Sequence, residues 1–521
     1  MNRELDALDT EALFDRSVPA EEAPSLNYLA ALSGGHVTRR GIRAFDLEGL
    51  KQKRRGFGVD ELSKKDPTDW ARAMLLENCR DGVAMIAFWR GQWWVWDTYW
   101  QETPIHLIRR RVYEFFDEKK FSNYDAETKD VKITRVKPDS SMVNQTIDVL
   151  CGLCAVEDDI EPFTWRGTGP NPDFLLPVRN GILNLLTSEL LPHTPDFMAI
   201  GVADWDWTGK AYAPERFGGF TRSLWPVDQG ERNYLQELLG WMLSGDRSLQ
   251  KIVLLHGPTR AGKGTLIRLI QHLLGEQRYT PVNAAAFSSE FGFAGTVDKR
   301  LAIAGDLRID HKVDAGAMTE RLLQVSGGDT IRVGRKYIGD WRGAATARVL
   351  ISVNEIPKLP DDSGALANRY APLAFNIRFL GREDTRLDDD LRAEAEGIAK
   401  WAMVGLQRLM SRGRFAFPDS SARLIRRSQN SASPVREFVN DCCKIVSERR
   451  TPVDALYRVY IEWCADAGLK PSAKNRFGEA LQNAFSEIST GRMPGPRSEK
   501  RASCYIGIEV RNDSSSPDTV S

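Results

Sequence analysis

The chain has 521 residues, and its 71 basic and 71 acidic side chains give a formal net charge of zero at pH 7. This balance excludes a uniformly basic nucleic-acid coat but not a locally basic channel, because the local potential governs contact with DNA. The length predicts about three or four domains, and no apolar run is long enough to span a membrane. The polar start of the chain lacks the pattern of a secretion signal, so we expect a cytoplasmic protein with reduced cysteines.

Two predicted units come first along the chain. Residues 1–105 are predicted to be a polar region that ends in an aromatic β-hairpin around Gly91, and residues 106–234 a helical or mixed domain. The Trp and Tyr side chains of the hairpin can stack on bases, but packing on one face of the hairpin is the favoured interpretation. We expect helices within 106–160, and a helix over 231–245 that leads into the next domain.

A glycine-rich turn is the most informative part of the chain. A strand, a glycine-rich turn and a helix N-terminus form a phosphate cradle of the Walker A type, in which backbone N–H groups face the phosphates and a lysine neutralises them. Here the turn lies between the apolar run 252–255 and the helical pattern 266–270. The predicted nucleotide-binding residues are Gly257, Pro258, Thr259, Arg260, Ala261, Gly262, Lys263, Gly264 and Thr265.

The turn departs from the usual pattern at one position. Gly264 stands where the pattern has Ser or Thr, and the hydroxyl comes one residue later, at Thr265. Thr265 is therefore the candidate hydroxyl ligand of Mg²⁺. Because the turn follows an apolar strand, we predict an α/β P-loop NTPase domain over 235–412.

Later strand ends carry polar residues that suit phosphate chemistry. One apolar strand pattern ends at Asp306, which can hold Mg²⁺ or orient the attacking water, and another ends at Asn354, which can position that water. Arg369 follows as a candidate for the arginine that stabilises transition-state charge from a neighbouring subunit. The ordered set of Lys263, Asp306, Asn354 and Arg369 favours catalysis over isolated turn formers.

With these motifs in place, residues 235–412 resemble the superfamily 3 helicases, in particular the phage and plasmid primase–helicase family related to the poxvirus primase–helicase. The matching stretches are Lys299–Ala304, Gly327–Ile331, Arg335–Tyr337, Ser352–Pro357, Ser363–Arg369 and Phe379–Asp384. The resemblance extends upstream to Arg179–Asn184 and downstream to about residue 510. The family often has Glu or two adjacent acids at the second strand, whereas Asp306 stands alone.

The resemblance implies an AAA+-like motor that forms a ring, expected to be a hexamer, with ATP and Mg²⁺ between subunits. Asp306 and Thr265 are the expected metal ligands, and Arg369 would come from the next subunit. Arg335 and Lys336 match a channel hairpin whose basic residues grip single-stranded DNA, and an ordinary solvated turn is the alternative interpretation. Unwinding would run 3′-to-5′ and serve replication of a phage, prophage or plasmid in the cytoplasm of a bacterial host cell.

The C-terminal part is predicted to bind duplex DNA. Residues 413–431 resemble an exit linker, and residues 432–511 predict a winged helix with helices over 435–447, 453–467 and 472–487 and a strand over 500–510. Residues 421–511 hold 16 Lys and Arg against 10 Asp and Glu. The candidate wing residues are Arg497, Lys500 and Arg501, and a protein-docking module is the alternative. Residues 512–521 predict a disordered tail.

Two other functions stay open at this point. One is an initiator that uses ATP only to assemble on an origin or melt it, without processive unwinding. The other is a nucleotide kinase, which the Gly-Lys-Gly-Thr turn suggests and the arrangement of Asn354 and Arg369 disfavours. The first 170 residues show no acidic constellation for primer synthesis, so we expect a helicase without its own primase, with a separate primase or another replication protein as a partner.

Overall fold

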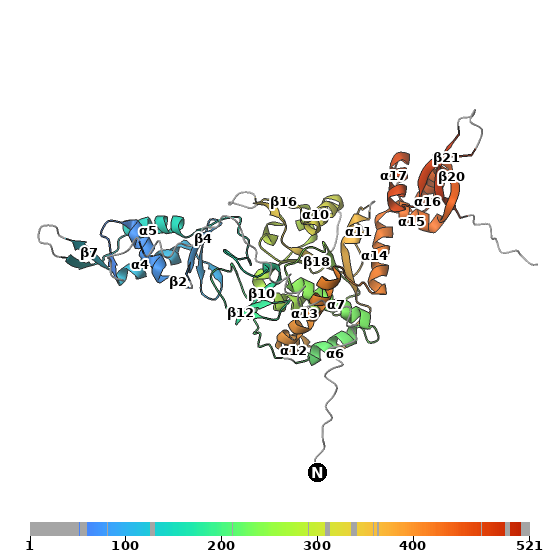
Figure 1. Ribbon diagram of the computed structural model, residues 1–521. Coiled ribbons are helices and arrows are strands. Elements are labelled where there is room, and N and C mark those ends of the chain that lie inside the picture. The colour runs from blue at the N-terminus through green and yellow to red at the C-terminus, as the bar shows by residue number, and fades with distance from the viewer. Residues whose placement is uncertain are drawn as a thin grey trace, which may run out of the picture.

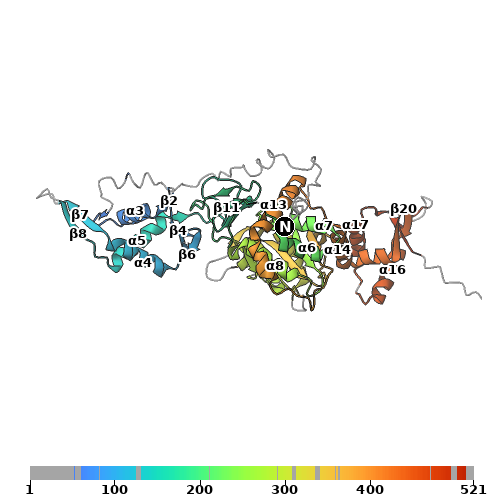
Figure 2. The same cartoon turned by 90° about the horizontal axis from the view of Figure 1, so that it is seen from below.

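The computed structural model (Figure 1) describes residues 52, 60–80, 82–124, 131–210, 212–289, 291–307, 313–334, 341–357, 359–361, 364–469, 471–494 and 501–511. The predictions for the first 51 residues, for 53–59 and for the tail 512–521 lie outside the described residues. So do those for Arg335, Lys336, Arg497 and Lys500. In both views an N-terminal part and a C-terminal part lie on opposite sides of a central domain that holds the largest sheet (Figures 1 and 2).

The N-terminal part contains both helices and strands. The predicted aromatic hairpin forms: β4 pairs with β5, with Trp89 opposite Gln92, and Arg90 and Gly91 turn with positive φ angles of 53° and 76°. Trp89, Trp93 and Trp96 are buried, so the hairpin aromatics pack in the core. The elements are β1 (Glu61–Leu62), α3 (Pro67–Glu77), β2 (Cys79–Arg80), β3 (Val83–Ala84), β4 (Ile86–Trp89), β5 (Gln92–Trp96), β6 (Trp100–Glu102), α4 (Ile105–Asp117), β7 (Lys120–Tyr124), β8 (Val131–Arg135), α5 (Ser140–Leu153) and β9 (Ala155–Val156).

The prediction of helices throughout 106–160 is wrong in its middle. The antiparallel hairpin of β7 and β8 lies between α4 and α5. Its strands read Lys-Phe-Ser-Asn-Tyr and Val-Lys-Ile-Thr-Arg, in which β-branched and aromatic residues alternate with polar ones, a composition that favours strands.

A small sheet and two helices connect this part to the central domain. They are η2 (Pro172–Phe174), β10 (Leu175–Val178), β11 (Gly181–Asn184), β12 (Leu190–Leu191), α6 (Glu215–Leu224) and α7 (Gln229–Leu243). The helix predicted over 231–245 is α7, whose N-terminus is capped by Asp228, since its carboxylate accepts from the backbone N–H of Glu231.

The central domain is built on one parallel sheet with the strand order β14-β15-β18-β13-β19. The strands β13, β15, β18 and β19 are almost entirely buried runs because both faces of the sheet are covered. Val253 and Leu255 pack with α7, α8 and α13 on one face, and Ile252 and Leu254 pack with α9, α10 and α11 on the other.

The elements of this domain are β13 (Ile252–His256), α8 (Lys263–Leu274), η3 (Glu276–Arg278), β14 (Tyr279–Pro281), α9 (Ala284–Ser288), η4 (Ala294–Thr296), β15 (Leu301–Ala304), α10 (Ala315–Gly327), β16 (Thr330–Val333), β17 (Trp341–Ala344), β18 (Arg348–Val353), α11 (Ala365–Arg369), β19 (Tyr370–Ala374), α12 (Leu387–Ala393) and α13 (Ala395–Arg412). The two extended arms predicted within 330–346 are the antiparallel strands β16 and β17.

The segment 413–431, predicted to be an exit linker, is mostly a helix. Helix α14 (Asp419–Ala432) lies against β19 at the edge of the sheet, and the buried Ser421 hydroxyl donates to the carbonyl oxygen of Pro372 at 2.5 Å. At its other end the Gln429 amide donates to Asn368 at 2.9 Å. The C-terminal part is therefore joined to the central domain by a packed helix.

The C-terminal part follows the order helix, strand, two helices, two strands. Its elements are α15 (Pro434–Cys442), β20 (Cys443–Pro452), α16 (Val453–Asp466), α17 (Lys474–Ala484), β21 (Ser489–Arg492) and β22 (Ser503–Val510). The strands form an antiparallel sheet of order β20-β22-β21. The predicted helix 435–447 ends at Cys442, because the next ten residues pair with β22, with Cys443 opposite Val510.

Candidate active site

The glycine-rich turn, Asp306 and Asn354 lie at one edge of the parallel sheet. Ile351 of β18 pairs with Leu254 of β13 on one side and with Ala304 of β15 on the other. All three strands run in the same direction, so the residues that follow them leave the sheet at the same edge. We call this the carboxyl edge.

The glycines of the turn have conformations that a side chain would disturb. Gly257 has a φ of 156°, and a Cβ there would lie 2.1 Å from the carbonyl oxygen of Phe375. Gly262 has a φ of 92° and precedes α8 directly. These two positions bring the backbone into a tight loop that directs the first N–H groups of α8 toward the carboxyl edge, as phosphate binding requires.

The ammonium group of Lys263 is the centre of the turn. Only 8% of the residue is exposed, and its Nζ donates to the carbonyl oxygens of Gly257 at 2.5 Å and Pro258 at 2.8 Å and to Asn354 Oδ1 at 3.0 Å. Burial lowers the pKa of Lys263, and the nearby charge of Asp306 opposes this. The structure thus brings Lys263 and Asn354 together, with Asp306 in their field.

The donor set at this edge fits a small hard cation together with phosphate oxygens. Asp306 is exposed, and Thr265 lies in the first turn of α8. The hydroxyl of Thr265 accepts from Arg268 at 3.2 Å, and Arg268 pairs with Asp388 at 2.6 Å. Among the described residues no group of three His, Cys, Asp or Glu could hold a metal by itself. Mg²⁺ is commonly held by one or two protein oxygens, phosphate oxygens and water, which these residues can supply.

Arg369 lies at the opposite edge, which we call the amino edge. It immediately precedes β19, where Tyr370 pairs with Ile252, whereas Ala374 pairs with His256, next to the turn. The strand from Tyr370 to Ala374 spans about 13 Å. The Nη1 atom of Arg369 is buried and makes no hydrogen bond to the part of the chain that the structure describes. Lys263 and Arg369 are thus not brought together within one chain.

A different arginine lies at the carboxyl edge, and the sequence motifs did not single it out. Arg378 follows β19 and donates to Thr259 in the turn, from Nη2 to the hydroxyl at 3.0 Å and from Nε to the carbonyl oxygen at 3.3 Å. The backbone N–H of Phe379 donates to the carbonyl oxygen of Arg260 at 2.8 Å. The family-like stretch Phe379–Asp384 begins one residue later, which was the available signal.

The predicted DNA-binding residues are only partly described. Arg335 and Lys336 follow β16 in the sequence and Arg497 and Lys500 follow β21, and all four lie outside the described residues. Arg501 is half-buried ahead of β22, and its carbonyl oxygen accepts from Arg492 at 3.1 Å.

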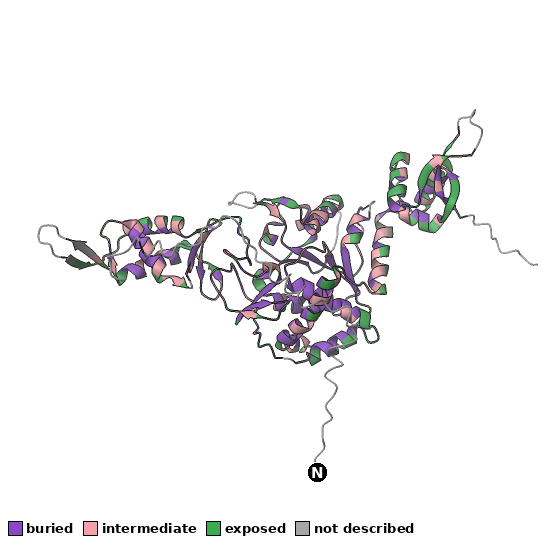
Figure 3. Cartoon of the chain, in the orientation of Figure 1, coloured by how far each residue is buried: buried purple, intermediate pink, exposed green. Residues whose placement is uncertain are grey.

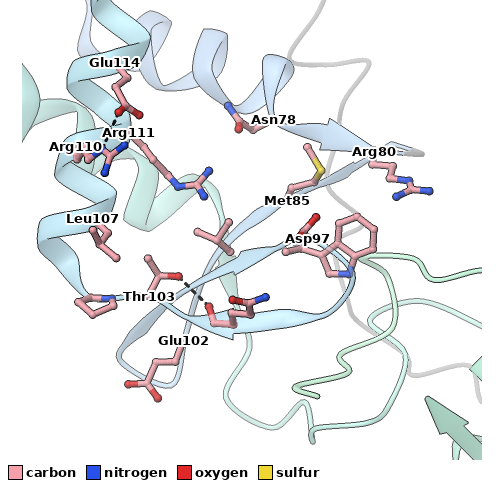
Figure 4. A pocket seen from close by; sticks show the side chains of 14 residues that line it. Asn78, Arg80, Met85, Asp97, Glu102, Thr103, Leu107, Arg110, Arg111 and Glu114 are labelled. Carbon is pink, nitrogen blue, oxygen red and sulfur yellow. Dashed lines mark hydrogen bonds and ion pairs between the residues drawn. The ribbon is translucent and has the colours of Figure 1, made fainter. Parts of the chain in front are cut away.

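A second hollow lies in the N-terminal part, between α4 and the sheet of β4, β5 and β6. Its volume is about 780 Å³, and Figure 4 shows Arg111 extending into it from α4. Its three arginines, Arg80, Arg110 and Arg111, are matched by three acids, Asp97, Glu102 and Glu114. Arg110 pairs with Glu114 at 2.8 Å. The lining has no net charge and gives no preference for an anion.

Comparison with known proteins identifies three family matches along the chain. Residues 89–226 match the family "D5 N terminal like", residues 255–369 match a family of unknown function, DUF5906, and residues 431–507 match the family "Poxvirus D5 protein-like". The first and last lie on either side of the glycine-rich turn, so the resemblance extends well beyond the central domain.

A curated relative and solved structures also match. The Acanthamoeba polyphaga mimivirus protein named "Putative helicase L207/L206" is 22% identical over 249 residues, which cover 45% of this chain. The match spans about a quarter of that relative's length (25%). Two apo structures of the NrS-1 C-terminal region (305–718) have TM-scores of 0.47 at 13% and 12% identity and cover 85% and 86% of this chain and 100% of theirs.

No helix among the described residues is long and apolar enough to cross a membrane. The family resemblance predicted from the motifs is confirmed, because D5-type matches lie both before and after the glycine-rich turn and a helicase-named relative aligns with the chain. These matches support the placement of this chain in a D5-like primase–helicase family.

Proposed function

We propose that the chain is an ATP-hydrolysing DNA helicase of superfamily 3 that works as a ring of identical subunits, expected to be a hexamer. The observation that carries this proposal is the division of the predicted catalytic residues between the two edges of the sheet. Lys263 and Asn354 lie together at the carboxyl edge, and Arg369 lies at the amino edge. The strand order supports an AAA+-like P-loop motor. Strand β13, which precedes the glycine-rich turn, lies between β18 and β19, the two strands of this sheet that come last in the chain.

Within one subunit the described contacts suggest a role for each residue. The lysine is held by two carbonyl oxygens and an amide oxygen, which phosphate oxygens can replace. Asn354, released from Lys263, can then orient a water toward the terminal phosphate, and Asp306 can hold the metal or accept the water's proton. Bound Mg²⁺ would neutralise charge on the phosphates, with Thr265 and Asp306 as its protein ligands.

A second copy of the chain is needed to complete this site. Arg369 is too far along β19 to reach the cradle of its own subunit, so a ring that sets one amino-edge surface against the next carboxyl edge would supply it. An arginine offered in this way contributes roughly 10³–10⁵ in rate in known NTPases. An isolated subunit is expected to bind ATP and hydrolyse it poorly.

The hairpin of β16 and β17 and the C-terminal part are the proposed DNA contacts. Arg335 and Lys336 would grip single-stranded DNA in the ring, and Arg497, Lys500 and Arg501 would contact duplex phosphates. We propose 3′-to-5′ movement in replication of a phage, prophage or plasmid, in the cytoplasm of a bacterial host cell. A separate primase, or another replication protein, is the proposed partner.

Strand displacement tests this function. Forked duplexes with a 3′ or a 5′ single-stranded tail are incubated with the protein, ATP and Mg²⁺, and Lys263→Ala is the negative control. We expect ATP-dependent displacement only with the 3′ tail. Origin melting without displacement of long forks would instead support an initiator, and phosphate transfer to a nucleoside monophosphate would support a kinase.

A further inference from the structure

Helix α17 has one buried side and one polar side. Its buried residues are Phe477, Ala480, Leu481 and Ala484, which pack in the core of the C-terminal part. The exposed residues follow the opposite side at helical spacing, and we call them the α17 stripe. The stripe consists of Asn475, Arg476, Glu479, Gln482 and Asn483, and Figure 3 shows exposed residues along this helix.

The side chains of the stripe are of the types that recognise base edges. Asn and Gln form paired hydrogen bonds with adenine, Arg with guanine, and Glu accepts from cytosine. A helix that binds only phosphates would instead present several lysines or arginines. The single lysine of α17, Lys474, is already paired with Asp454 of α16. The stripe therefore offers hydrogen-bond patterns and almost no net charge.

Three further arginines of this part lie on or next to the strands of its sheet. Arg450 of β20 donates to the carbonyl oxygen of Arg492 at 2.8 Å, and Arg492 donates to that of Arg501 at 3.1 Å. All three arginines thus gather where β21 ends and β22 begins. Arg450 and Arg492 are exposed there. Arginines on a sheet beside a polar helix of almost no net charge suit a duplex, since the arginines can meet phosphates while the helix enters the major groove.

We propose that the α17 stripe reads a specific duplex sequence through the major groove. This inference rests on the proposed binding of duplex DNA by the C-terminal part, and it goes further by assigning sequence choice to five residues. It gives the ring a means of loading at a defined site on the replicating element, separate from the sequence-independent grip on single strands.

The test selects from a random duplex library with the full-length chain, and then measures affinities by fluorescence anisotropy. We expect one enriched motif, bound at least about tenfold more tightly than a scrambled duplex. The affinity of the double variant Asn475→Ala with Gln482→Ala for the motif should fall at least about fivefold for each lost base contact. Its affinity for the scrambled duplex and its ATP turnover should be unchanged.

Two further variants control for folding and for position. Asn440→Ala removes an exposed amide on α15, away from the stripe, and should keep full discrimination. Arg476→Lys keeps the charge but loses the paired geometry, and should weaken binding only to motifs that retain one particular guanine. This second variant decides the matter if the double variant does not fold.

The outcomes separate this inference from the proposed function. Duplex binding without an enriched motif, or equal losses on motif and scrambled duplex, overturns the reading role and leaves the helicase proposal intact. Stripe variants that never change duplex affinity would assign this face to a protein partner and overturn it as well. Failure of the parent chain to bind any DNA would contradict the proposed function itself.

Discussion

At the carboxyl edge of the motor sheet the buried cation is Lys263, whereas at the amino edge the buried cations are Arg278, Arg300 and Arg348. The ammonium group of Lys263 is held by three oxygen atoms, and the oxygens of a phosphate can take their place. Arg348 donates instead to the carbonyl oxygens of Trp241, Met242 and Ser244 at the end of α7, and its guanidinium lies 4.6 Å from the Trp241 ring centre.

The amino-edge arginines join the motor to the segments that precede it. Arg300 pairs with Asp173 at 3.4 Å, and Arg278 lies 4.4 Å from the ring centre of Phe163. A cation that satisfies helix-end carbonyls is structural, because the last carbonyl oxygens of a helix have no partner within the helix itself. Burial alone therefore does not identify a catalytic cation. A catalytic cation is identified by hydrogen-bond partners that the substrate can replace.

Removal of Lys263 should give the largest effect. We expect Lys263→Ala to lose ATP turnover to background, because water cannot replace the ammonium group in a closed cradle. Turnover is measured by phosphate release with and without single-stranded DNA. The matched control is Lys299→Ala at the amino edge, whose Nζ donates to Gln277 and whose loss should leave turnover near the parent value. Near-parent turnover in Lys263→Ala would mean that the nucleotide site lies elsewhere.

Removal of Arg369 should be nearly as damaging, but only to hydrolysis. We expect Arg369→Ala to bind a fluorescent ATP analogue with parent affinity and to hydrolyse ATP about 10³-fold more slowly. Arg342→Ala, an exposed arginine on β17, is the control. If Arg369→Ala lost nucleotide binding in parallel with its unfolding midpoint, a structural role at the amino edge would replace the catalytic one.

Arg348 should matter for stability rather than for chemistry. Arg348→Ala removes a charged donor from three buried carbonyl oxygens, of which that of Trp241 keeps the hydroxyl of Ser244 as a donor. We expect a loss of about 2–4 kcal/mol in the unfolding free energy of the motor. Urea denaturation followed by tryptophan fluorescence measures this. Arg378→Ala, at the other edge, should leave the unfolding midpoint unchanged. Equal unfolding midpoints for Arg348→Ala and the parent would contradict the structural role assigned to the buried arginines of the amino edge.

Arg378 should give the smallest effect at the carboxyl edge. Its hydrogen bonds to Thr259 hold an exposed part of the turn, so Arg378→Ala should weaken nucleotide affinity about tenfold, on the order of one charge-assisted hydrogen bond. Titration with a fluorescent nucleotide measures it. Arg382→Ala is the control, because Arg382 is an exposed arginine nearby in the sequence, as Arg378 is. An unchanged affinity would limit Arg378 to shaping the empty loop.

The sequence could predict the cradle because its signals are local. A strand, two glycines and a helix start identify the turn from neighbouring residues, and the hairpin at Gly91 needs only its own two arms. Strand β20 could not be predicted in this way, because it pairs with β22 about sixty residues later. Local periodicity extended the predicted helix to residue 447 instead.

Two other features depend on tertiary contacts. Helix α14 has the Ser-rich start of a linker, and its structure is explained by packing on β19, where Ser421 meets Pro372. The separation of Arg369 from Lys263 depends on which end of β19 lies beside the turn. The pattern of a single strand does not reveal its direction or register in the sheet. The motifs therefore identified both residues as catalytic candidates, and only the fold shows that they lie at opposite edges.

Mixing two inactive variants tests the central claim most directly. Lys263→Ala keeps Arg369, and Arg369→Ala keeps Lys263, so about a quarter of the interfaces in a random one-to-one ring would combine both intact residues. Subunit exchange is first verified by fluorescence transfer between labelled variants, and ATP turnover is then measured. The account predicts turnover clearly above the sum of the two variants alone. Mixed rings with no turnover above that sum would contradict a site completed by the neighbouring subunit.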